Sequence, residues 1–457
     1  MKRIVILAVL LFTCASLCSA LEPVTDRIVV LVSIDGLAHY YMDDPKAEMP
    51  TIRQLAAEGA RAEKMKAVMP TVTWPNHTTL VTGVTPAKHG VIGNTWLDRA
   101  RNEIVPVIWD PLLSKQEICR VPTIYDLAKQ AGLTTAAVTW PGSRSAKTLD
   151  WTVPCVTSSA LFIRLSTPSL LEEFKRGGIP YENEADGFKP GGGEGRDRLH
   201  VRMFNHIIRT HRPQLALMHV LEVDHVQHAH GPQSPEAYAS VKVADGLVRE
   251  IWDELQKTFP GKATVIVVSD HGFFPYRQTI LPNVVLRKAG LLTATTNKIT
   301  GSQVRAVSQG GAALLYVTDT QNCDRLTRQV VAVFKDVEGV ALTLTTRDFP
   351  RYGLADPARE PRMCDVVLSA KSGYSFSDSV VGDETVTAPT KVARGSHGYD
   401  HNEPMMHATF VAWGAGIRRG VKVGTITNTS VAPTIATLLG LEMKNTDGQP
   451  LTMILTK

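Results

Sequence analysis

The sequence has no strong excess of charge of either sign. Its 49 basic and 44 acidic residues give a formal net charge of +5 at pH 7. Loss of Lys2 and Arg3 with the leader described below lowers that value from +5 to +3. A positive charge so small and so dispersed does not indicate a nucleic-acid-binding protein. The sequence also lacks a repeat of solenoid length and a heptad run, which argues against solenoids and coiled coils.

Long apolar runs are absent beyond the N-terminus. Residues 1–20 contain two basic residues, the apolar run IVILAVLLF and a finish of small residues at Cys18, Ser19 and Ala20. This pattern predicts a cleaved signal peptide. A retained anchor is the alternative, but the run is short for a membrane span. We therefore expect a soluble periplasmic or secreted protein with no stable membrane span after cleavage.

Cysteine is scarce, with six residues in a chain of 457. Four remain after the leader, namely Cys119, Cys155, Cys323 and Cys364. An oxidising compartment favours disulfides, and four cysteines allow three connectivities. We expect Cys119 to pair with Cys155 and Cys323 with Cys364, because each pair lies within one segment of the chain.

The features that are present predict an α/β fold. Apolar, β-rich runs alternate with helical segments that stop at glycine, such as TIRQLAAEG and VPTIYDLAKQAG. With 44% hydrophobic residues, a chain of this length can bury a large core. We expect one catalytic domain over residues 21–457, with a mainly parallel central sheet covered by helices on both faces.

A separate group of strand and helix signals lies at about residues 275–390. It includes GAALLYV, CDRLTRQVVAVFKDV and CDVVLSAK. We expect a small α+β insertion here, which returns the chain to the main domain at His397. The insertion could form one wall of the functional site and so influence which leaving groups the site accepts. The alternative is that it has a structural role only.

Five short motifs carry most of the candidate chemistry. They are SIDG ending at Gly36, PTVTWPNH at 70–77, EVDHVQH at 222–228, SDHG at 269–272 and GSHG at 395–398. A catalytic zinc ion takes about three His, Asp or Glu ligands and keeps one position open. The motifs supply two such sets: Asp35, Asp270 and His271, and Asp224, His228 and His397.

The surrounding sequence brings these ligands together. RIVVLVSI runs into Asp35, QLALMHVL runs toward Asp224, and TVIVVS runs into Asp270. Ligands of an open α/β sheet collect beyond the carboxyl ends of its strands. The four-residue spacing from Asp224 to His228 places both on one face of a helical turn. Two ions about 3.5–4 Å apart can hold the attacking and leaving oxygens of a displacement at phosphorus, so the motifs predict a two-metal phosphoryl hydrolase.

Other histidines near these motifs are not expected to bind metal. The chain has 14 histidines, and those outside the two sets are predicted to be surface or hydrogen-bonding residues. They include His77, His225, His230 and His401.

Thr73 is the candidate nucleophile. It precedes Trp74 and Pro75, and Pro75 is expected to open a helix that stops at Gly83. The positive end of that helix would favour a phosphate. Because a free threonine hydroxyl is a poor nucleophile, we expect the metal ion of the Asp35 set to coordinate and activate it. Taken alone, Thr73 fits a helix-capping role better.

Together the motifs resemble the nucleotide pyrophosphatase/phosphodiesterase family, the type I phosphodiesterases of the alkaline phosphatase superfamily. The resemblance extends from RIVVLVSIDGL to APTIATLLGLEMKNTDGQPL and includes DHVQHAHGPQSPEAYASVKVADGLV. It implies an alkaline-phosphatase-like fold and two zinc ions at the two ligand sets. It also implies a phospho-threonine intermediate at Thr73. Asn94, after HGVIG, would donate its side-chain amide to a non-bridging phosphoryl oxygen.

The resemblance also concerns the substrate. Trp74 stands where many members carry a phenylalanine that stacks on the nucleotide base, and tryptophan keeps a stacking face. Packing alone is the alternative for Trp74, and Trp140 and Trp151 are candidates for a second stacking residue. We expect hydrolysis of phosphodiester or pyrophosphate bonds in small, nucleotide-type substrates. Manganese or iron would suit the same ligands as zinc.

Two other functions fit parts of the sequence. A phosphomonoesterase or phosphonate hydrolase of the same superfamily would use basic side chains to bind the additional phosphoryl charge. Arg144 and Lys147 could serve, although both are more often solvent-facing charges. A non-catalytic phosphate- or nucleotide-binding protein is the alternative of another class, but binding alone does not require both a nucleophile and a full set of metal ligands.

Overall fold

A computed structural model describes residues 26–108, 113–182 and 193–456 of the chain. The expected signal peptide, residues 1–20, lies outside the described residues. Within the described ranges, no helix has both the length and the apolar character needed to cross a membrane.

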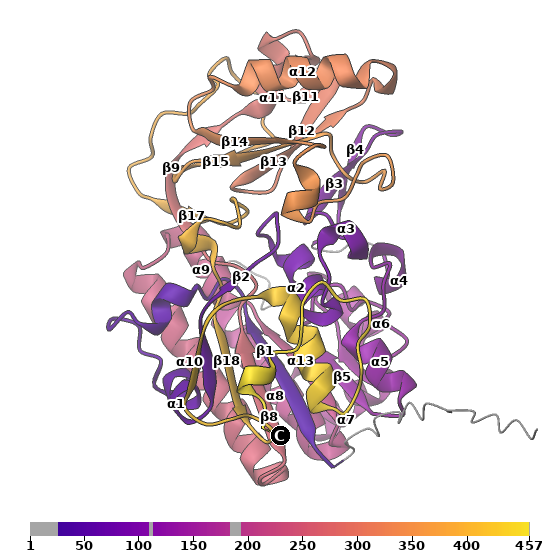
Figure 1. The fold of residues 1–457 in the computed structure, drawn as a ribbon, viewed down its shortest axis with the longest axis vertical. Helices are drawn as coiled ribbons and strands as arrows, with labels where there is room; N and C mark the ends of the chain where they lie inside the picture. Colours follow the sequence, from indigo (N-terminus) through magenta and orange to yellow (C-terminus); the bar gives the residue numbers. More distant parts are fainter. Residues whose placement is uncertain (1–25, 109–112, 183–192, 457) are drawn as a thin grey trace, which may run out of the picture.

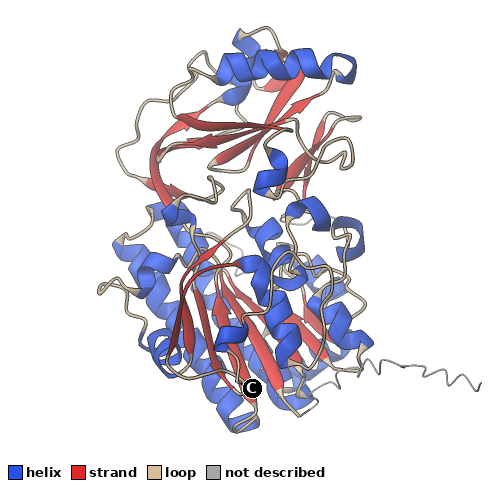
Figure 2. Ribbon diagram, viewed as in Figure 1, coloured by secondary structure: helices blue, strands red, loops and turns tan. Residues whose placement is uncertain are grey.

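Eight strands form the larger sheet, in the order β19-β2-β18-β8-β1-β7-β5-β6 (Figures 1 and 2). In that order, their bounds are Val421–Thr427, Ala60–Lys66, Phe410–Gly414, Ala263–Val268, Ile28–Ile34, Leu215–Val220, Thr135–Val138 and Trp151–Val153. Strands β8, β1, β7, β5 and β6 are mutually parallel, whereas β18 is antiparallel to both of its neighbours. The mainly parallel sheet expected from the sequence is confirmed.

Strand β1 shows why these runs form a sheet with two covered faces. All seven of its residues are buried. Val30 and Val32 pack on one face of the sheet, and Val29 and Leu31 pack on the other. Successive side chains of a strand point to opposite faces, so a strand covered on both sides is a continuous apolar run.

Helices cover both faces of the large sheet. One face carries α1 (Pro50–Glu58), α6 (Ser159–Leu165), α7 (Pro168–Arg176), α8 (Gly193–His211), α9 (Glu222–His230) and α10 (Pro235–Thr258). The other carries α2 (Thr73–Thr82), α5 (Ile124–Gln130) and α13 (Val431–Leu438). Short helices α3 (Pro86–His89) and α4 (Lys115–Ile118) lie in the connections.

Residues 274–396, here called the small lobe, leave the large sheet after β8 and return before β18. A four-stranded antiparallel sheet, β12-β13-β15-β14, forms its centre (Figure 1). The bounds are Val304–Ser308, Ala312–Val317, Val366–Ala370 and Val340–Thr345. Helices α11 (Pro282–Lys288) and α12 (Cys323–Phe334) pack on one face. The remaining strands are β9 (Phe274–Ile280), β10 (Leu292–Thr295), β11 (Lys298–Ser302), β16 (Gly373–Phe376) and β17 (Arg394–Ser396).

The other face of the small-lobe sheet packs against the main part of the chain. Val307 and Leu314 of the lobe share an apolar cluster with Met69, Ile92 and Leu97. Leu97 belongs to β3 (Thr95–Asp98), which forms a hairpin with β4 (Glu103–Pro106). The loops at 69 and 92 flank the candidate nucleophile and Asn94, so the lobe is packed directly against this region.

The expected disulfides are not formed: within the described residues, no disulfide joins any two of the four cysteines. Cys119 lies in an apolar cluster with Trp74, and its Sγ donates a hydrogen bond to the carbonyl of Val121. Cys364 is buried on the face of the small-lobe sheet that meets the main part of the chain, whereas Cys323 packs with the helical face. Proximity in the sequence did not reveal that these two thiols lie on opposite sides of one sheet.

Candidate active site

The carboxyl ends of three adjacent strands bring the candidate ligands together. Asp35 directly follows β1, and its N–H donates to the carbonyl of Val220 at the end of β7. Asp224 lies in α9, which begins two residues after β7, and Asp270 follows β8. Helix α9 lies beside β17, where the small lobe meets the main part of the chain (Figure 1).

Asp35, Asp270 and His271 present three converging ligand atoms. His271 Nε2 lies 3.4 Å from Asp35 Oδ1 and 3.2 Å from Asp270 Oδ2. All three atoms are buried, and none has a hydrogen-bond partner among the described residues. Ligand atoms about 2.0–2.2 Å from a tetrahedral ion lie roughly 3.3–3.6 Å apart. The three atoms therefore fit a single cation.

Asp224, His228 and His397 form a second group. His397 Nε2 lies 3.5 Å from Asp224 Oδ1 and 3.2 Å from His228 Nε2, and His228 Nε2 lies 3.5 Å from Asp224 Oδ2. His271 also comes within 4.8 Å of Asp224 and His397, because its ring stacks on His397 at a centroid distance of 3.7 Å. We assign His271 to the first group, since its Nε2 is directed at Asp35 and Asp270.

Backbone carbonyls determine which nitrogen each of these histidines can offer. Nδ1 of His228, His271 and His397 donates to the carbonyls of Gly395, Gly272 and Thr71, at 3.0, 3.2 and 3.0 Å respectively. In a neutral ring this leaves Nε2 with its lone pair. Such a bond to the far nitrogen is the usual support for a metal-binding histidine. The facing lone pairs of His228 and His397 repel each other unless a cation lies between them.

The electrostatics of the metal-free site also favour cation binding. Burial raises the pKa of Asp35 well above its usual range, and the negative charges of Asp270 and Asp224 raise it further. Burial, with Asp224, raises the pKa of Asp270 to about 8. Burial lowers the pKa of His397 to about 4 and that of His271 well below its usual value. Neutral imidazoles beside poorly solvated carboxylates are a suitable donor set for a divalent ion.

Thr73 is the first residue of α2, and its side chain is almost completely buried. The helix was expected to open at Pro75, but it begins two residues earlier. Pro75 is tolerated there because the first-turn N–H groups have no partner within the helix. The helix ends at Thr82, followed by Gly83 with φ +69°, as expected. The carbonyl of Thr73 accepts from His77 Nδ1 at 2.9 Å, and that nitrogen lies 3.5 Å from Asp270 Oδ2.

Asn94 lies beside the start of α2. Its side-chain Oδ1 accepts a 3.0 Å hydrogen bond from the N–H of Trp74, the residue after Thr73. Its main-chain carbonyl accepts from the N–H groups of Val107 and Ile108. The amide oxygen is therefore engaged with the helix start, and the NH₂ group is the part of the side chain able to donate to a substrate.

Trp74 and Trp140 are buried more deeply than a residue that stacks on a nucleotide base would be, whereas Trp151 is half-buried. Trp74 is 3% exposed and packs with Val91, Val107 and Ile118, which favours packing over base stacking. Trp140 is 1% exposed, edge-on to His77 behind the first ligand group. Trp151, on the edge strand β6, stacks on the ring of His211 at 4.4 Å. Trp140 is therefore closed to a nucleotide base, and one face of the Trp151 ring is covered by His211.

Arg144 and Lys147 differ in their exposure to solvent. Lys147 is exposed, but the Arg144 side chain is 5% exposed. Its guanidinium donates to the carbonyl of Cys155 at 3.5 Å, and its own carbonyl accepts from the N–H of Lys115. These two hydrogen bonds link the loop that follows β5 to Cys155 and Lys115, so Arg144 stabilises this loop.

Sequence reasoning missed several side chains that support the ligands. His219, the second-last residue of strand β7, places Nε2 3.0 Å from Asp35 Oδ2. Gln227, between Asp224 and His228 on the buried side of α9, donates to the carbonyl of Gly36 at 2.9 Å. A polar residue inside an otherwise apolar run was the available signal for His219. For Gln227 the signal was its position four residues after the apolar Val223, on the same face of the helix.

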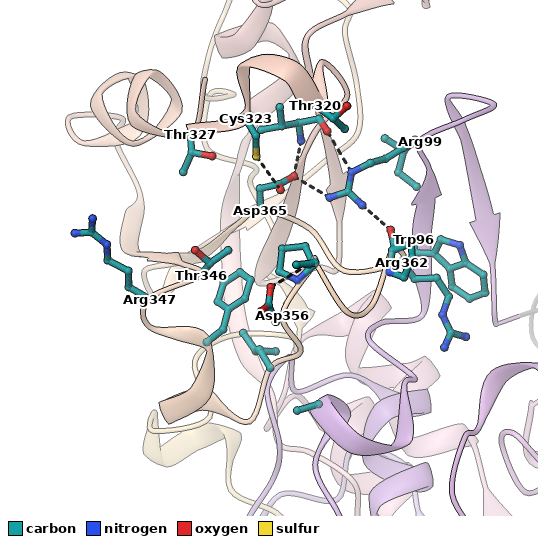
Figure 3. Close-up of a pocket in the computed structure, with 18 of the residues that line it drawn as sticks. Trp96, Arg99, Thr320, Cys323, Thr327, Thr346, Arg347, Asp356, Arg362 and Asp365 are labelled. Atoms are coloured by element: carbon teal, nitrogen blue, oxygen red, sulfur yellow. Dashed lines mark hydrogen bonds and ion pairs between the residues drawn. The ribbon is translucent and has the colours of Figure 1, made fainter. Parts of the chain in front are cut away.

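A large cavity in the described part of the chain lies away from these ligands (Figure 3). It has a volume of about 1280 Å³, and Arg99, Cys323 and Asp365 are among its lining residues. Arg99 donates to Asp365 Oδ2 at 2.8 Å and to two backbone carbonyls, and the Cys323 thiol donates to Asp365 Oδ1 at 3.5 Å. These polar groups satisfy one another, and no residue of the two ligand groups lines the cavity.

An α/β sandwich with two candidate cation sites beyond its strand ends defines an alkaline-phosphatase-like class of protein. Residues 29–400 match the family described as type I phosphodiesterase / nucleotide pyrophosphatase. The chain belongs to this family, so the resemblance inferred from the motifs is confirmed, as is the alkaline-phosphatase-like fold.

Individual relatives are distant in sequence. The chain is 25% identical over 424 residues to human ectonucleotide pyrophosphatase/phosphodiesterase family member 1, covering 90% of this chain and 40% of that protein. It is 23% identical over 431 residues to a venom phosphodiesterase of Macrovipera lebetinus, covering 92% and 44%, and 24% identical over 427 residues to family member 7 of Rattus norvegicus, covering 92% and 85%. The chain thus spans under half the length of most of these relatives.

Solved structures share the fold. Murine ectonucleotide pyrophosphatase/phosphodiesterase 5, in an inactive variant bound to AMP, has a TM-score of 0.69 and 19% identity, covering 94% of this chain and 100% of that chain. The human counterpart has a TM-score of 0.69 and 20% identity, with the same coverage. At this identity the similarity establishes the fold alone.

Proposed function

We propose that this protein is a two-metal hydrolase that cleaves phosphodiester or pyrophosphate bonds through a phospho-threonine intermediate at Thr73. Membership of the family supports phosphodiester hydrolysis as the reaction. The observation that carries the proposal is the convergence of buried, partnerless atoms of Asp35, Asp270 and His271 close to the start of α2. A structural cluster of this kind, left without a cation, would cost stability with no compensating bond.

The residues have distinct roles in the proposed reaction. Thr73 Oγ loses its proton to solvent and attacks phosphorus. The bond from phosphorus to the leaving oxygen breaks, that oxygen departs with the electron pair and takes up a proton from solvent, and the phosphoryl group remains on Thr73. Asn94 donates its amide N–H to a non-bridging oxygen, where negative charge is stabilised in the transition state. Water then attacks phosphorus and releases Thr73. Each displacement inverts the configuration at phosphorus, so the two together retain it.

Two zinc ions are the proposed cofactors. Asp35, Asp270 and His271 would hold one ion, with Thr73 as a further ligand, and Asp224, His228 and His397 would hold the other. Bound there, the ions would supply positive charge beside the attacking and leaving oxygens and would lower the pKa of a hydroxyl group. Manganese or iron fits the same donor atoms.

Nucleotide-type molecules are the proposed substrates. The structural relative that was solved with AMP and the pyrophosphatase/phosphodiesterase names of the sequence relatives support this choice. The burial of Trp74 removes one expected base contact, so base recognition would rest on other residues.

Secretion is also proposed, on the basis of the leader and of relatives named as venom enzymes or ectoenzymes.

Substrate preference is the direct test of the reaction class. With zinc-loaded protein, kcat/KM for a p-nitrophenyl nucleotide diester is expected to exceed that for p-nitrophenyl phosphate by about a hundredfold or more. This corresponds to roughly 2.7 kcal/mol of differential transition-state binding. A preference for the monoester would contradict the proposal and would direct attention to Arg144 and Lys147.

A further inference from the structure

We propose that Gln309, in the small lobe, is a positioning residue for Asn94. The inference rests on the proposed function, because it concerns how the donor to the phosphoryl group is held. It also assigns an active role to the small lobe, which the sequence left as either a wall of the site or a passive excursion.

Gln309 lies in the turn between β12 and β13, and its side chain is 5% exposed. Its Oε1 accepts a 2.8 Å hydrogen bond from the main-chain N–H of Asn94. Its Nε2 donates to the carbonyl and the hydroxyl of Thr95, at 3.0 and 2.9 Å. One side-chain amide therefore binds the N–H of Asn94 and both the carbonyl and the hydroxyl of Thr95.

These bonds complete a fixed frame around Asn94. The N–H of Asn94 is bound by Gln309, its carbonyl accepts from Val107 and Ile108, and its Oδ1 accepts from the N–H of Trp74. Gly93 has no room for a side chain, because a Cβ at that position would lie 2.8 Å from Gln309 Oε1. A segment held at all these points has little freedom to rotate, so the orientation of the Asn94 NH₂ group depends on Gln309.

The same turn also holds the second ligand group. The N–H of Gly311 donates to the carbonyl of His397 at 2.6 Å. A Cβ on Gly398, which has φ +100°, would collide with the Gln309 carbonyl. Residues 309–311 thus contact the segments that carry Asn94 and His397. The small-lobe turn acts as a template that sets the spacing between the phosphoryl donor and the second candidate metal site.

Removal of the Gln309 bonds should slow the chemical step. A displacement of about 1 Å in a catalytic group can cost on the order of a hundredfold in rate. We expect Gln309→Met, which keeps the side-chain length, to lower kcat for a nucleotide diester by roughly 10- to 100-fold. KM should change by less than about threefold, because the Asn94 contact strengthens as charge develops in the transition state.

A double-mutant cycle with Asn94→Ala separates positioning from general damage. If Gln309 acts through Asn94, Gln309→Met in the Asn94→Ala background should lower kcat by no more than about threefold. Full additivity of the two losses would overturn the inference. Asn94→Ala with wild-type kcat would instead defeat the proposed role of Asn94. A slow Asn94→Ala enzyme with a fast Gln309→Met enzyme would overturn the inference alone.

Asn283 provides the matched control. It is another buried amide of the small lobe, and it clamps Ala306 of β12 through both its oxygen and its nitrogen. Asn283→Leu should lower the melting temperature and leave kcat near the wild-type value. An equal fall in kcat would mean that any disturbance of the lobe has the same effect and would overturn the inference.

A milder variant covers the case in which Gln309→Met does not fold. Thr95→Val removes only the hydroxyl that accepts from Gln309 Nε2. It should lower kcat severalfold, and this loss should also disappear in the Asn94→Ala background. A loss that persists in that background would overturn the inference.

Discussion

Thr73→Ala is expected to lower kcat for a nucleotide diester by roughly 10⁴-fold or more, the scale seen when an enzyme loses its covalent nucleophile. The substitution removes one hydroxyl at the start of α2. The carbonyl of Thr73 would still accept from His77, and the N–H of Trp74 would still donate to Asn94. Initial rates on purified wild-type and variant proteins, with matched circular dichroism spectra, measure the effect.

Two other variants limit the interpretation of this result. Thr73→Ser keeps a hydroxyl and should recover part of the activity. Thr82→Ala removes a buried hydroxyl of the same helix that donates only to the carbonyl of Thr78, at 2.7 Å, and should leave kcat close to the wild-type value. Unchanged turnover in Thr73→Ala would contradict the assignment of Thr73 as nucleophile.

Removal of the metal ions is expected to lower kcat by at least roughly 10³-fold, about 4 kcal/mol of transition-state stabilisation. Dialysis against a chelator, metal analysis and re-addition of zinc measure this loss and its recovery. Full activity in protein shown to be metal-free would contradict a two-metal mechanism.

Chelation should also make stability depend on pH with a defined sign. In the metal-free protein, burial with the charge of Asp224 raises the pKa of Asp270 to about 8, and the pKa of Asp35 is also raised, first by burial. Between the unfolded-state pKa near 4 and pH 8, the folded protein holds protons that the unfolded chain has released. These two carboxyl groups should therefore contribute less to metal-free stability as pH rises across that window, whereas His271 and His397, whose pKa values burial lowers, should contribute more. Because metal binding requires the deprotonated carboxylates, the loss of stability on chelation should be larger at pH 8 than at pH 5. Melting temperatures at pH 5 and pH 8, with and without chelator, test this, and a larger chelator effect at pH 5 would contradict it.

A pair of carboxylate variants distinguishes metal binding from structural charge. Asp270→Asn should remove at least one equivalent of bound metal together with activity. Asp245 is also buried, but its two oxygens accept from the N–H groups of Thr51 and Ile52 at the start of α1. Asp245→Asn should lower stability and keep the metal content. Loss of metal in both variants would indicate general unfolding.

The strands around the site could be predicted because their local pattern and their burial agree. β1, β7 and β8 are mostly apolar runs, each followed within a few residues by a carboxylate. Parallel neighbours place their carboxyl ends at one edge of the sheet, so the proximity of Asp35, Asp224 and Asp270 follows from the strands. The antiparallel direction of β18 has no comparable local signal.

Contacts between distant segments could not be predicted from local pattern. Gln309 and Asn94 are separated by 215 positions in the sequence, and no periodicity relates a turn in one sheet to a loop beside another. The thiols of Cys323 and Cys364 illustrate the same limit, since their faces depend on how the small-lobe sheet is covered. The burial of Trp74 depends on its apolar neighbours Val107 and Ile118, and its position beside the candidate nucleophile in the sequence did not indicate that burial.

The stereochemical course at phosphorus is the most direct test of a phospho-threonine intermediate at Thr73. A diester made chiral at phosphorus by sulfur and a heavy oxygen isotope would be hydrolysed by the zinc-loaded wild-type protein, and the configuration of the product would be determined. Net retention is expected, because attack by Thr73 and attack by water each invert the configuration at phosphorus. Net inversion would show that water attacks the substrate directly, and would contradict a phospho-threonine intermediate.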